Sequence, residues 1–176
     1  MEVLYLAALK AEIQGLKNFI LTGVGKINAS FTTTDMINKF HPKKIINFGT
    51  AGSTKKNISG LVQCTNFIQR DMDVRGLLDF KLGQTPFDNI NEIKFGSGGF
   101  TCATGDSFVK SKILLDCDIV DMEAYAIAKI CKLKNVKFEC YKYISDYTNE
   151  NSNKDWNINI NKGVQLFLEK FPDCKL

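Results

Sequence analysis

The sequence predicts an α/β fold, with a central mixed and largely parallel sheet between two layers of helices. The first observation is that short apolar runs alternate with segments of helical periodicity along the chain. The second is that polar side chains follow the ends of several apolar runs, where a parallel sheet collects its functional groups. The third is that no repeat, low-complexity tract or linker interrupts the 176 residues. We therefore expect one three-layer domain over residues 1–176.

Each expected element has its own signal. Strands are expected where mostly apolar residues occur together: Val3–Ala8, Lys44–Phe48, Leu61–Arg70, Phe100–Thr104, Ile119–Met122 and Phe138–Ile144. Helices are expected where apolar residues recur with helical spacing: from about Lys10 with Ile13, Leu16 and Ile20, then Ile27–Phe40, Glu123–Lys132 and Gly163–Phe171. His41-Pro42 ends the second of these helices, because proline cannot continue a helix and restricts the residue before it.

The composition excludes several classes of protein. The net charge is +4, but the lysines are scattered and no basic stripe is interleaved with aromatic residues, so no nucleic-acid partner is expected. The six cysteines show no CxxC pair and no metal-ligand spacing with His41, so we expect reduced thiols, no metal and no cofactor. The first residues do not form a signal peptide or a membrane span, which indicates a cytoplasmic protein without a membrane partner.

Five side chains follow predicted strands and are candidates for one binding site. They are Glu12, Thr50, Phe108, Glu123 and Asp146. Ligands of open α/β sheets bind outside the carboxyl ends of the strands, so this set predicts a pocket for a small molecule. The alternative for each acid is that it faces a helix N-terminus, which is favourable by roughly 0.3–1 kcal/mol.

Six short segments occur in an order that resembles a known family. They are Ala7–Glu12, Thr22–Ala29, Asn47–Gly52, Thr104–Val109, Val120–Ala128 and Ile144–Asp146. Together they are similar to the 5'-methylthioadenosine/S-adenosylhomocysteine nucleosidases of the nucleoside phosphorylase/hydrolase superfamily. The turn Gly23-Val24-Gly25-Lys26 lacks the third glycine of a dinucleotide site and the spacing of a P-loop, so a nicotinamide or NTP site is not expected.

The resemblance implies hydrolysis of the N-glycosidic bond of an adenine nucleoside. It gives Asp146 the role of the acid that protonates N7 of adenine, since the base leaves poorly until it is protonated. Glu123 corresponds to the residue that holds the ribose hydroxyls, and Met122 packs against the sugar. Glu12 corresponds to the base that activates water, and Thr50 stands where the family has a serine in the same network. Two separated carboxyl groups in these roles form an inverting arrangement.

The resemblance also assigns the walls of the pocket. Phe108 corresponds to the aromatic residue that stacks on adenine, and the backbone of Val109 reads the edge of the base. Leu9 and Val24 lie near the 5' end of the substrate, where apolar side chains favour a methylthio or homocysteine tail. Ser145 fixes the loop that carries Asp146.

Two departures from the family are visible. Lys142 stands where the family often has arginine, and lysine supplies the charge without the bidentate fork. Only nine residues separate Glu12 from Thr22, where the family normally inserts a β-hairpin. The chain therefore resembles a shortened member, with a reduced outer sheet and pocket wall.

Two alternatives remain open. A purine nucleoside phosphorylase would share the fold but needs cations for phosphate, and arginine is preferred for that task. The two arginines, Arg70 and Arg75, flank the Asp71–Asp73 loop and not the Gly49–Gly52 turn, which favours water over phosphate, although Lys26 could contribute a point charge. The other alternative is a catalytically silent nucleoside-binding protein of the same fold.

The family forms homodimers in which a loop of the partner closes the alkylthio pocket. By position, residues Met72–Leu78 correspond to this loop. The resemblance thus implies a nucleoside and a second copy of the chain as partners.

Overall fold

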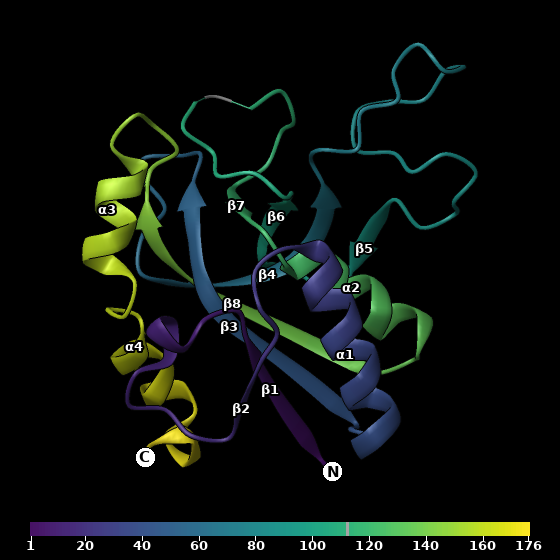
Figure 1. Cartoon of the computed structure of the whole chain (residues 1–176). Coiled ribbons are helices and arrows are strands. Elements are labelled where there is room, and N and C mark those ends of the chain that lie inside the picture. Colours follow the sequence, from purple (N-terminus) through teal and green to yellow (C-terminus); the bar gives the residue numbers. More distant parts are fainter. Residues whose placement is uncertain (112) are drawn as a thin grey trace.

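A computed structural model describes residues 1–111 and 113–176 of the chain. The strands are β1 (Val3–Ala7), β2 (Phe19–Leu21), β3 (Lys44–Ser53), β4 (Leu61–Gln69), β5 (Glu92–Lys94), β6 (Phe100–Thr104), β7 (Ile119–Asp121) and β8 (Lys137–Asp146) (Figure 1). The helices are α1 (Lys26–Phe40), α2 (Ala124–Leu133), α3 (Ser152–Asn159) and α4 (Val164–Lys170), with 3₁₀ turns at Lys10–Ile13 and Pro172–Cys174.

The strands of the described residues form one mixed sheet, and part of it closes into a ring. β3 pairs with β7, β7 with β6, β6 with β4, β4 with β8, and β8 again with β3. β1 and β2 extend the sheet outward from β3, and β5 extends it from β4. Five pairings are parallel and three are antiparallel, namely β3 with β7, β4 with β5 and β4 with β8. The predicted mixed, largely parallel sheet is confirmed.

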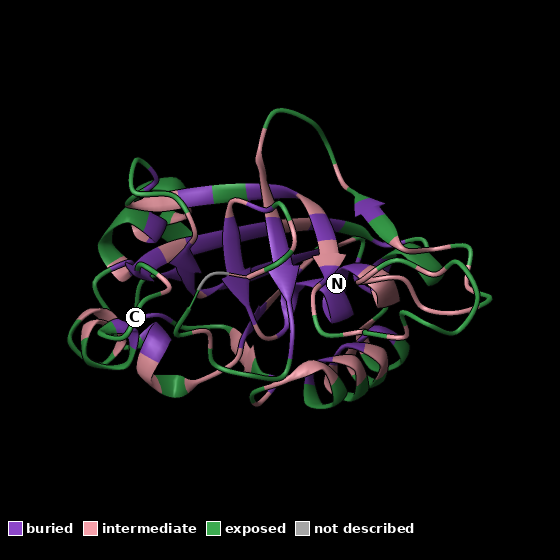
Figure 2. Ribbon diagram, turned by 90° about the horizontal axis from the view of Figure 1, so that it is seen from above, coloured by how far each residue is buried: buried purple, intermediate pink, exposed green. Residues whose placement is uncertain are grey.

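Helices cover both faces of the sheet, as the alternation of side chains along the strands requires. Leu4 and Ile45 belong to the apolar cluster that contains the buried residues of α1 and α2. Ala7 and Phe48 point to the other face, into a cluster with Phe167 of α4. Figure 2 shows that the strands are the most buried part of the chain, with exposed residues in loops and on the outer sides of the helices. This is the expected three-layer α/β/α arrangement.

Most predicted elements are confirmed, with bounds shifted by a few residues. β3 is longer than expected, because it continues through Gly49–Gly52 to Ser53. α1 ends as predicted at His41, which adopts a left-handed conformation with φ 45° before Pro42. β2, β5 and α3 have no counterpart among the predicted elements. Within the part of the chain that the structure describes, no helix combines the length and apolar character needed to cross a membrane.

The helix expected from about Lys10 is wrong. The structure has a single 3₁₀ turn at Lys10–Ile13, followed by strand β2, which pairs in parallel with β1. Gly15 and Asn18 have φ values of 92° and 65°, which are incompatible with a continuing α-helix and acceptable for these two residue types. Of the three apolar residues that suggested a helix, Ile13 and Leu16 belong to the cluster that contains Phe167 of α4, and Ile20 packs against the cluster on the α1 and α2 side. The short turn has a functional consequence, because it projects Glu12 toward the end of β3.

Candidate active site

The ten predicted site residues line one cavity of about 260 Å³. The cavity lies where the carboxyl ends of β3, β7 and β8 meet the loop after β6, the turn after β1 and helix α3. The predicted residues in its wall are Leu9, Glu12, Val24, Thr50, Phe108, Val109, Met122, Glu123, Ser145 and Asp146. Residues that were not predicted also line it: Ala8, Ala51, Gly52, Arg70, Ser107, Val120, Asp121, Asn153 and Trp156. A concave site with convergent carboxyl groups is typical of small-molecule chemistry.

Glu12 is held as an oriented acceptor at the end of β3. Its Oε1 accepts hydrogen bonds from the backbone N–H and the hydroxyl of Thr50, both at 2.8 Å. Its Oε2 accepts one from the backbone N–H of Leu9 at 3.1 Å. Gly49 makes room for the carboxylate, since a Cβ at this position would lie 3.1 Å from Oε1. The carboxyl group is therefore fixed, and Oε2 keeps a lone pair that can face the cavity.

Asp146 lies at the end of β8, on the other side of the same glycine-containing segment. A Cβ at Gly52 would stand 2.8 Å from its Oδ2, so any other residue here would force the carboxyl group to shift. Burial raises the pKa of Asp146, although hydrogen bonds from Ser145 and Ser152 oppose the shift. The Ser145 hydroxyl donates to Oδ1 at 2.8 Å. Asp146 therefore holds its proton more tightly than an exposed aspartate does.

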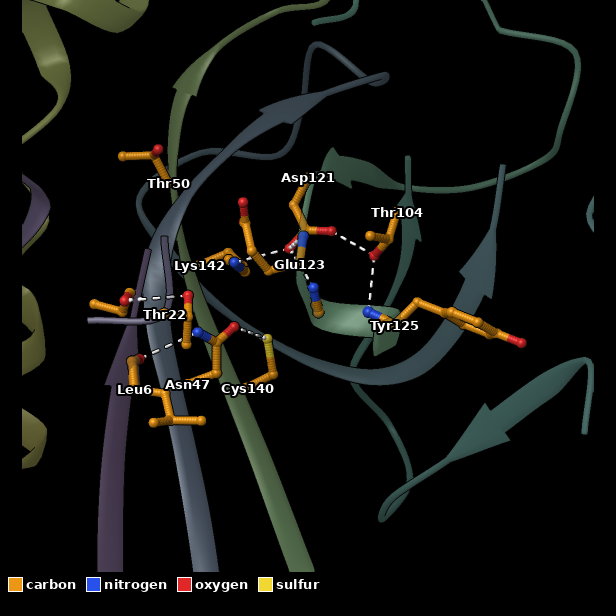
Figure 3. A network of polar contacts seen from close by, with 12 residues as sticks. Leu6, Thr22, Asn47, Thr50, Thr104, Asp121, Glu123, Tyr125, Cys140 and Lys142 are labelled. Carbon is orange, nitrogen blue, oxygen red and sulfur yellow. Dashed lines mark hydrogen bonds and ion pairs between the residues drawn. The ribbon is translucent and has the colours of Figure 1, made fainter. Parts of the chain in front are cut away.

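Asp121, which lines the cavity, forms a buried ion pair with Lys142 (Figure 3). Lys142 Nζ lies 2.9 Å from Asp121 Oδ2, and both side chains are almost completely excluded from solvent. The Thr104 hydroxyl donates to Oδ1 of Asp121 at 2.5 Å, and the backbone N–H groups of Glu123 and Ala124 donate to Oδ2. Burial alone would raise the pKa of Asp121, but Lys142 and these hydrogen bonds lower it below its ordinary value. Lys142, which stands where the family often has arginine, is thus paired with Asp121.

Glu123 has the opposite electrostatic environment from Asp121. Its Oε1 accepts a hydrogen bond from the backbone N–H of Gly25 at 2.9 Å. Burial and the negative charge of Asp121 raise the pKa of Glu123 to about 7, against the attraction of Lys142. Two neighbouring carboxyl groups whose pKa values are pushed apart are typical of a functional site.

Two aromatic rings face each other at the cavity. Phe108, which is 41% exposed, comes from the loop after β6, and Trp156 comes from α3. Their ring centroids are 6.5 Å apart at an interplanar angle of 74°. The indole N–H of Trp156 donates to Thr50 Oγ1 at 3.0 Å. Trp156 was missed from the sequence, because the surrounding segment is rich in asparagine and has no apolar periodicity; its only signal is that it is the single tryptophan of the chain.

One of the two arginines lies in the wall of the cavity, which the sequence did not predict. Arg70 follows β4 and lines the cavity, where its guanidinium donates to Gly105 O at 2.9 Å and to Ser107 Oγ at 3.0 Å. Its described hydrogen bonds thus support the loop before Phe108 and not the Gly49–Gly52 turn. Lys26 is also engaged, with Nζ 2.5 Å from Asp71 Oδ1. The described hydrogen bonds of Arg70 thus leave the Thr50 end of the cavity without an arginine, although Arg70 lines the cavity elsewhere.

The donor set shows no grouping suited to a metal. Among residues 1–111 and 113–176, no three His, Cys, Asp or Glu side chains come together as possible ligands of one ion. All six cysteines are buried as free thiols. What the site offers is an acid, an oriented carboxylate, a further buried carboxyl group and aromatic walls.

Comparison with known proteins agrees with this description. A family model described as the phosphorylase superfamily matches residues 12–95. The 5'-methylthioadenosine/S-adenosylhomocysteine nucleosidase of Anoxybacillus flavithermus is 30% identical over 161 residues, which covers 75% of this chain and 68% of the relative. The nucleosidase of Staphylococcus haemolyticus is 31% identical over 161 residues, which covers 76% of this chain and 70% of the relative.

The chain belongs to this nucleosidase family. The resemblance inferred from the six short segments is therefore confirmed. Solved structures support the fold of this member of the family: a Helicobacter pylori 5'-methylthioadenosine/S-adenosylhomocysteine nucleosidase has a TM-score of 0.87 at 22% identity, with 98% of both chains covered. A futalosine hydrolase mutant of the same organism also has a TM-score of 0.87 at 22% identity, covering 98% of this chain and 99% of the other.

Proposed function

We propose that this chain hydrolyses the N-glycosidic bond of an adenine nucleoside of the 5'-methylthioadenosine/S-adenosylhomocysteine type and releases adenine. Membership of the nucleosidase family supports the reaction class. The observation that carries the chemistry is the pair Glu12 and Asp146, which lie against Gly49 and Gly52 of the same segment. One carboxyl group accepts three hydrogen bonds and the other has a raised pKa, so that a base and an acid share one cavity.

The reaction begins at the base. Asp146 donates its proton to N7 of adenine, which makes the base a better leaving group. The C1'–N9 bond then breaks, its electron pair goes to the base, and positive charge develops on the ribose. Glu123 holds the ribose hydroxyls, and its partial negative charge stabilises the oxocarbenium-like transition state. Ser145 keeps Asp146 in position during this step.

Water completes the reaction on the opposite face of the sugar. Its oxygen attacks C1' while its proton passes to Glu12, and we assign this proton to Oε2, because Oε1 already accepts two hydrogen bonds from Thr50. Return of a proton from Glu12 to solvent and uptake of one by Asp146 restore the starting state. The product is the free sugar with inverted configuration, as two separated carboxyl groups imply.

The remaining side chains in the wall would hold the substrate. Phe108 stacks on adenine, and the backbone of Val109 reads its edge; stacking contributes roughly 1–3 kcal/mol per base. Met122 packs against the ribose. Leu9 and Val24 contact the 5' substituent, where their apolar character favours an alkylthio group over a hydroxyl.

Adenine release tests the proposal directly. The purified protein should release adenine from methylthioadenosine or S-adenosylhomocysteine without phosphate, and it should not act on inosine at a similar rate. Asp146→Asn should lower kcat by about 10²–10⁴-fold, the usual contribution of a general acid. Asp35→Asn, the same chemical change at an exposed position of α1, is the matched control. Formation of a sugar 1-phosphate would establish phosphorolysis instead, and nucleoside binding without turnover would establish a silent binder.

We further propose that the working form is a cytoplasmic homodimer. The chain exposes Leu77, Leu78 and Phe87 in the loop between β4 and β5, and Ile27 and Phe31 on α1. The loop extends away from the rest of the molecule in Figure 1, and it contains the predicted segment Met72–Leu78. Burial of these side chains against a second copy would remove a large apolar surface from water. Sedimentation of the wild type and of Leu78→Asp tests this: a dimer that the substitution dissociates supports it, and a monomeric wild type contradicts it.

A further inference from the structure

Helix α3 contacts both sides of the proposed reaction centre with one of its faces. Ser152, Trp156 and Asn159 follow the spacing i, i+4 and i+7, which places them on the same side of a helix. Trp156 donates to Thr50, Asn159 Nδ2 donates to Ser145 O at 2.8 Å, and Ser152 lies beside Asp146. A short polar helix without an apolar stripe is thus fixed mainly by contacts with the site itself.

Two hydrogen bonds connect Trp156 of α3 to Glu12 through Thr50, and the chemistry of the groups determines which group donates in each. An indole N–H is a donor only, so Thr50 Oγ1 must accept from Trp156. The single hydroxyl proton of Thr50 is then free to point at Glu12 Oε1, 2.8 Å away. The two hydrogen bonds therefore both point from Trp156 through Thr50 to Glu12, and neither can be reversed. Loss of the indole N–H would allow the Thr50 hydroxyl to rotate and donate elsewhere.

The same indole ring is part of the aromatic wall. It meets Phe108 edge to face, and both rings line the cavity in which the base would lie. A planar ligand that packs on this wall restricts the rotation of Trp156 and with it the Nε1–H. Trp156 therefore borders the leaving group with its ring and, through Thr50, orients the water-activating carboxylate of Glu12 with its N–H.

We propose that Trp156 is a positioning residue of the reaction, which fixes the carboxylate of Glu12 through Thr50 while its ring borders the base. The proposal rests on the proposed function for its kinetic consequences and on geometry alone for the hydrogen-bonded chain. It implies that Trp156 acts on the chemical step more than on substrate affinity. Phenylalanine at position 156 would keep the wall and lose the coupling.

Kinetics of Trp156→Phe separate these two contributions. We expect kcat to fall about tenfold, which corresponds to about 1.4 kcal/mol, with KM changed less than about twofold. Thr50→Val should lower kcat as well, and adding Trp156→Phe to it should cause no further loss, because the chain is already broken. Ile158→Ala, an exposed position of α3, is the control and should match the wild type. An unchanged kcat with a raised KM, or losses that simply multiply in the double variant, would overturn the proposal.

A second measurement does not depend on turnover. Because the chain has one tryptophan, its ¹⁵N–¹H spectrum contains one indole signal, that of Trp156. Thr50→Val should move this signal upfield and speed its exchange with solvent, and Glu12→Gln should move it through the intervening hydroxyl. If neither substitution moves this signal, the proposed hydrogen-bonded connection from Trp156 to Glu12 is wrong. If the wild type releases no adenine from any nucleoside, the proposed function fails, and this spectrum still decides whether Trp156 is coupled to Glu12.

Discussion

Replacing Lys142 by methionine should destabilise the fold strongly, because it removes the cation from a buried ion pair. The Lys142 and Asp121 side chains are 2% and 1% exposed, with 2.9 Å between Nζ and Oδ2. Breaking such a pair from one side typically costs 3–5 kcal/mol, since the other charge stays buried without compensation. Methionine is unbranched and of similar length, so little of this loss comes from a cavity. The hydrogen bonds from Thr104, Glu123 and Ala124 remain on Asp121, which places our expectation at the lower end, about 3 kcal/mol.

Urea unfolding at neutral pH, followed by the fluorescence of the single tryptophan, measures this loss. The informative control is the double variant Lys142→Met/Asp121→Asn, which removes both charges of the pair and should recover about half of the lost stability or more. An equal slope with urea is required for the comparison. A loss below about 1 kcal/mol in Lys142→Met, or a double variant no more stable than the single one, would refute the reasoning that this pair balances charge.

Three further predictions concern the carboxyl groups of the cavity. Gly52→Ala should lower kcat/KM about 100-fold with an unchanged circular dichroism spectrum, because its Cβ would stand 2.8 Å from Asp146 Oδ2 and displace the acid; wild-type activity would contradict the close contact. Ser145→Ala removes a hydrogen bond that lowers the pKa of Asp146, so the alkaline limb of the pH profile of kcat/KM should move to higher pH, and an unmoved limb would exclude Asp146 as the acid. The pKa of Glu123 in the folded state is raised from 4.5 to about 7, so the folded state holds this proton more tightly than the unfolded state does. The free energy of unfolding should therefore decline as the pH rises from about 4.5 to about 7. Relative to Glu123→Gln, the wild type should lose on the order of 3 kcal/mol over this range. Unfolding curves of both proteins at several pH values check the last prediction, and parallel pH dependences would contradict it.

Five of the residues that line the cavity follow the ends of predicted strands, whereas others, such as Leu9, Val24 and Met122, were expected only from the resemblance to the nucleosidase family. Thr50, Glu123 and Asp146 come directly at or after the ends of apolar runs, and strands of such runs bring their carboxyl ends together. Glu12 was predicted from the same rule, although the helix expected around it is a single 3₁₀ turn. The position of a residue relative to the end of a strand was thus a better guide than the type of the following element.

Features that depend on long-range contacts had no such signal. β2 is a strand because it pairs with β1, and Gly15 and Asn18 make the turn that allows it. The sequence around Trp156 contains mostly polar residues, and α3 forms there because its side chains find partners on Thr50 and Ser145. Partners of this kind come from segments distant in the chain, so propensity and periodicity carry no information about them.

The closed ring of strands has a consequence for how the protein reaches its native state. β8 pairs with β3 across a sequence separation of 93 residues at Asn47 and Cys140, and the same strand also closes the ring through β4. Contacts so distant in sequence carry a large loop-closure entropy and slow the folding reaction. During synthesis the ring stays open until β8 has left the ribosome, and the residues of β3 that pair with β8 stay unpaired until that moment. Glu12 lies against Gly49 of β3 and Asp146 ends β8, so the two carboxyl groups share one cavity only after β3 and β8 have paired. Recovery of activity after dilution from urea should therefore follow the folding phase in which the ring closes.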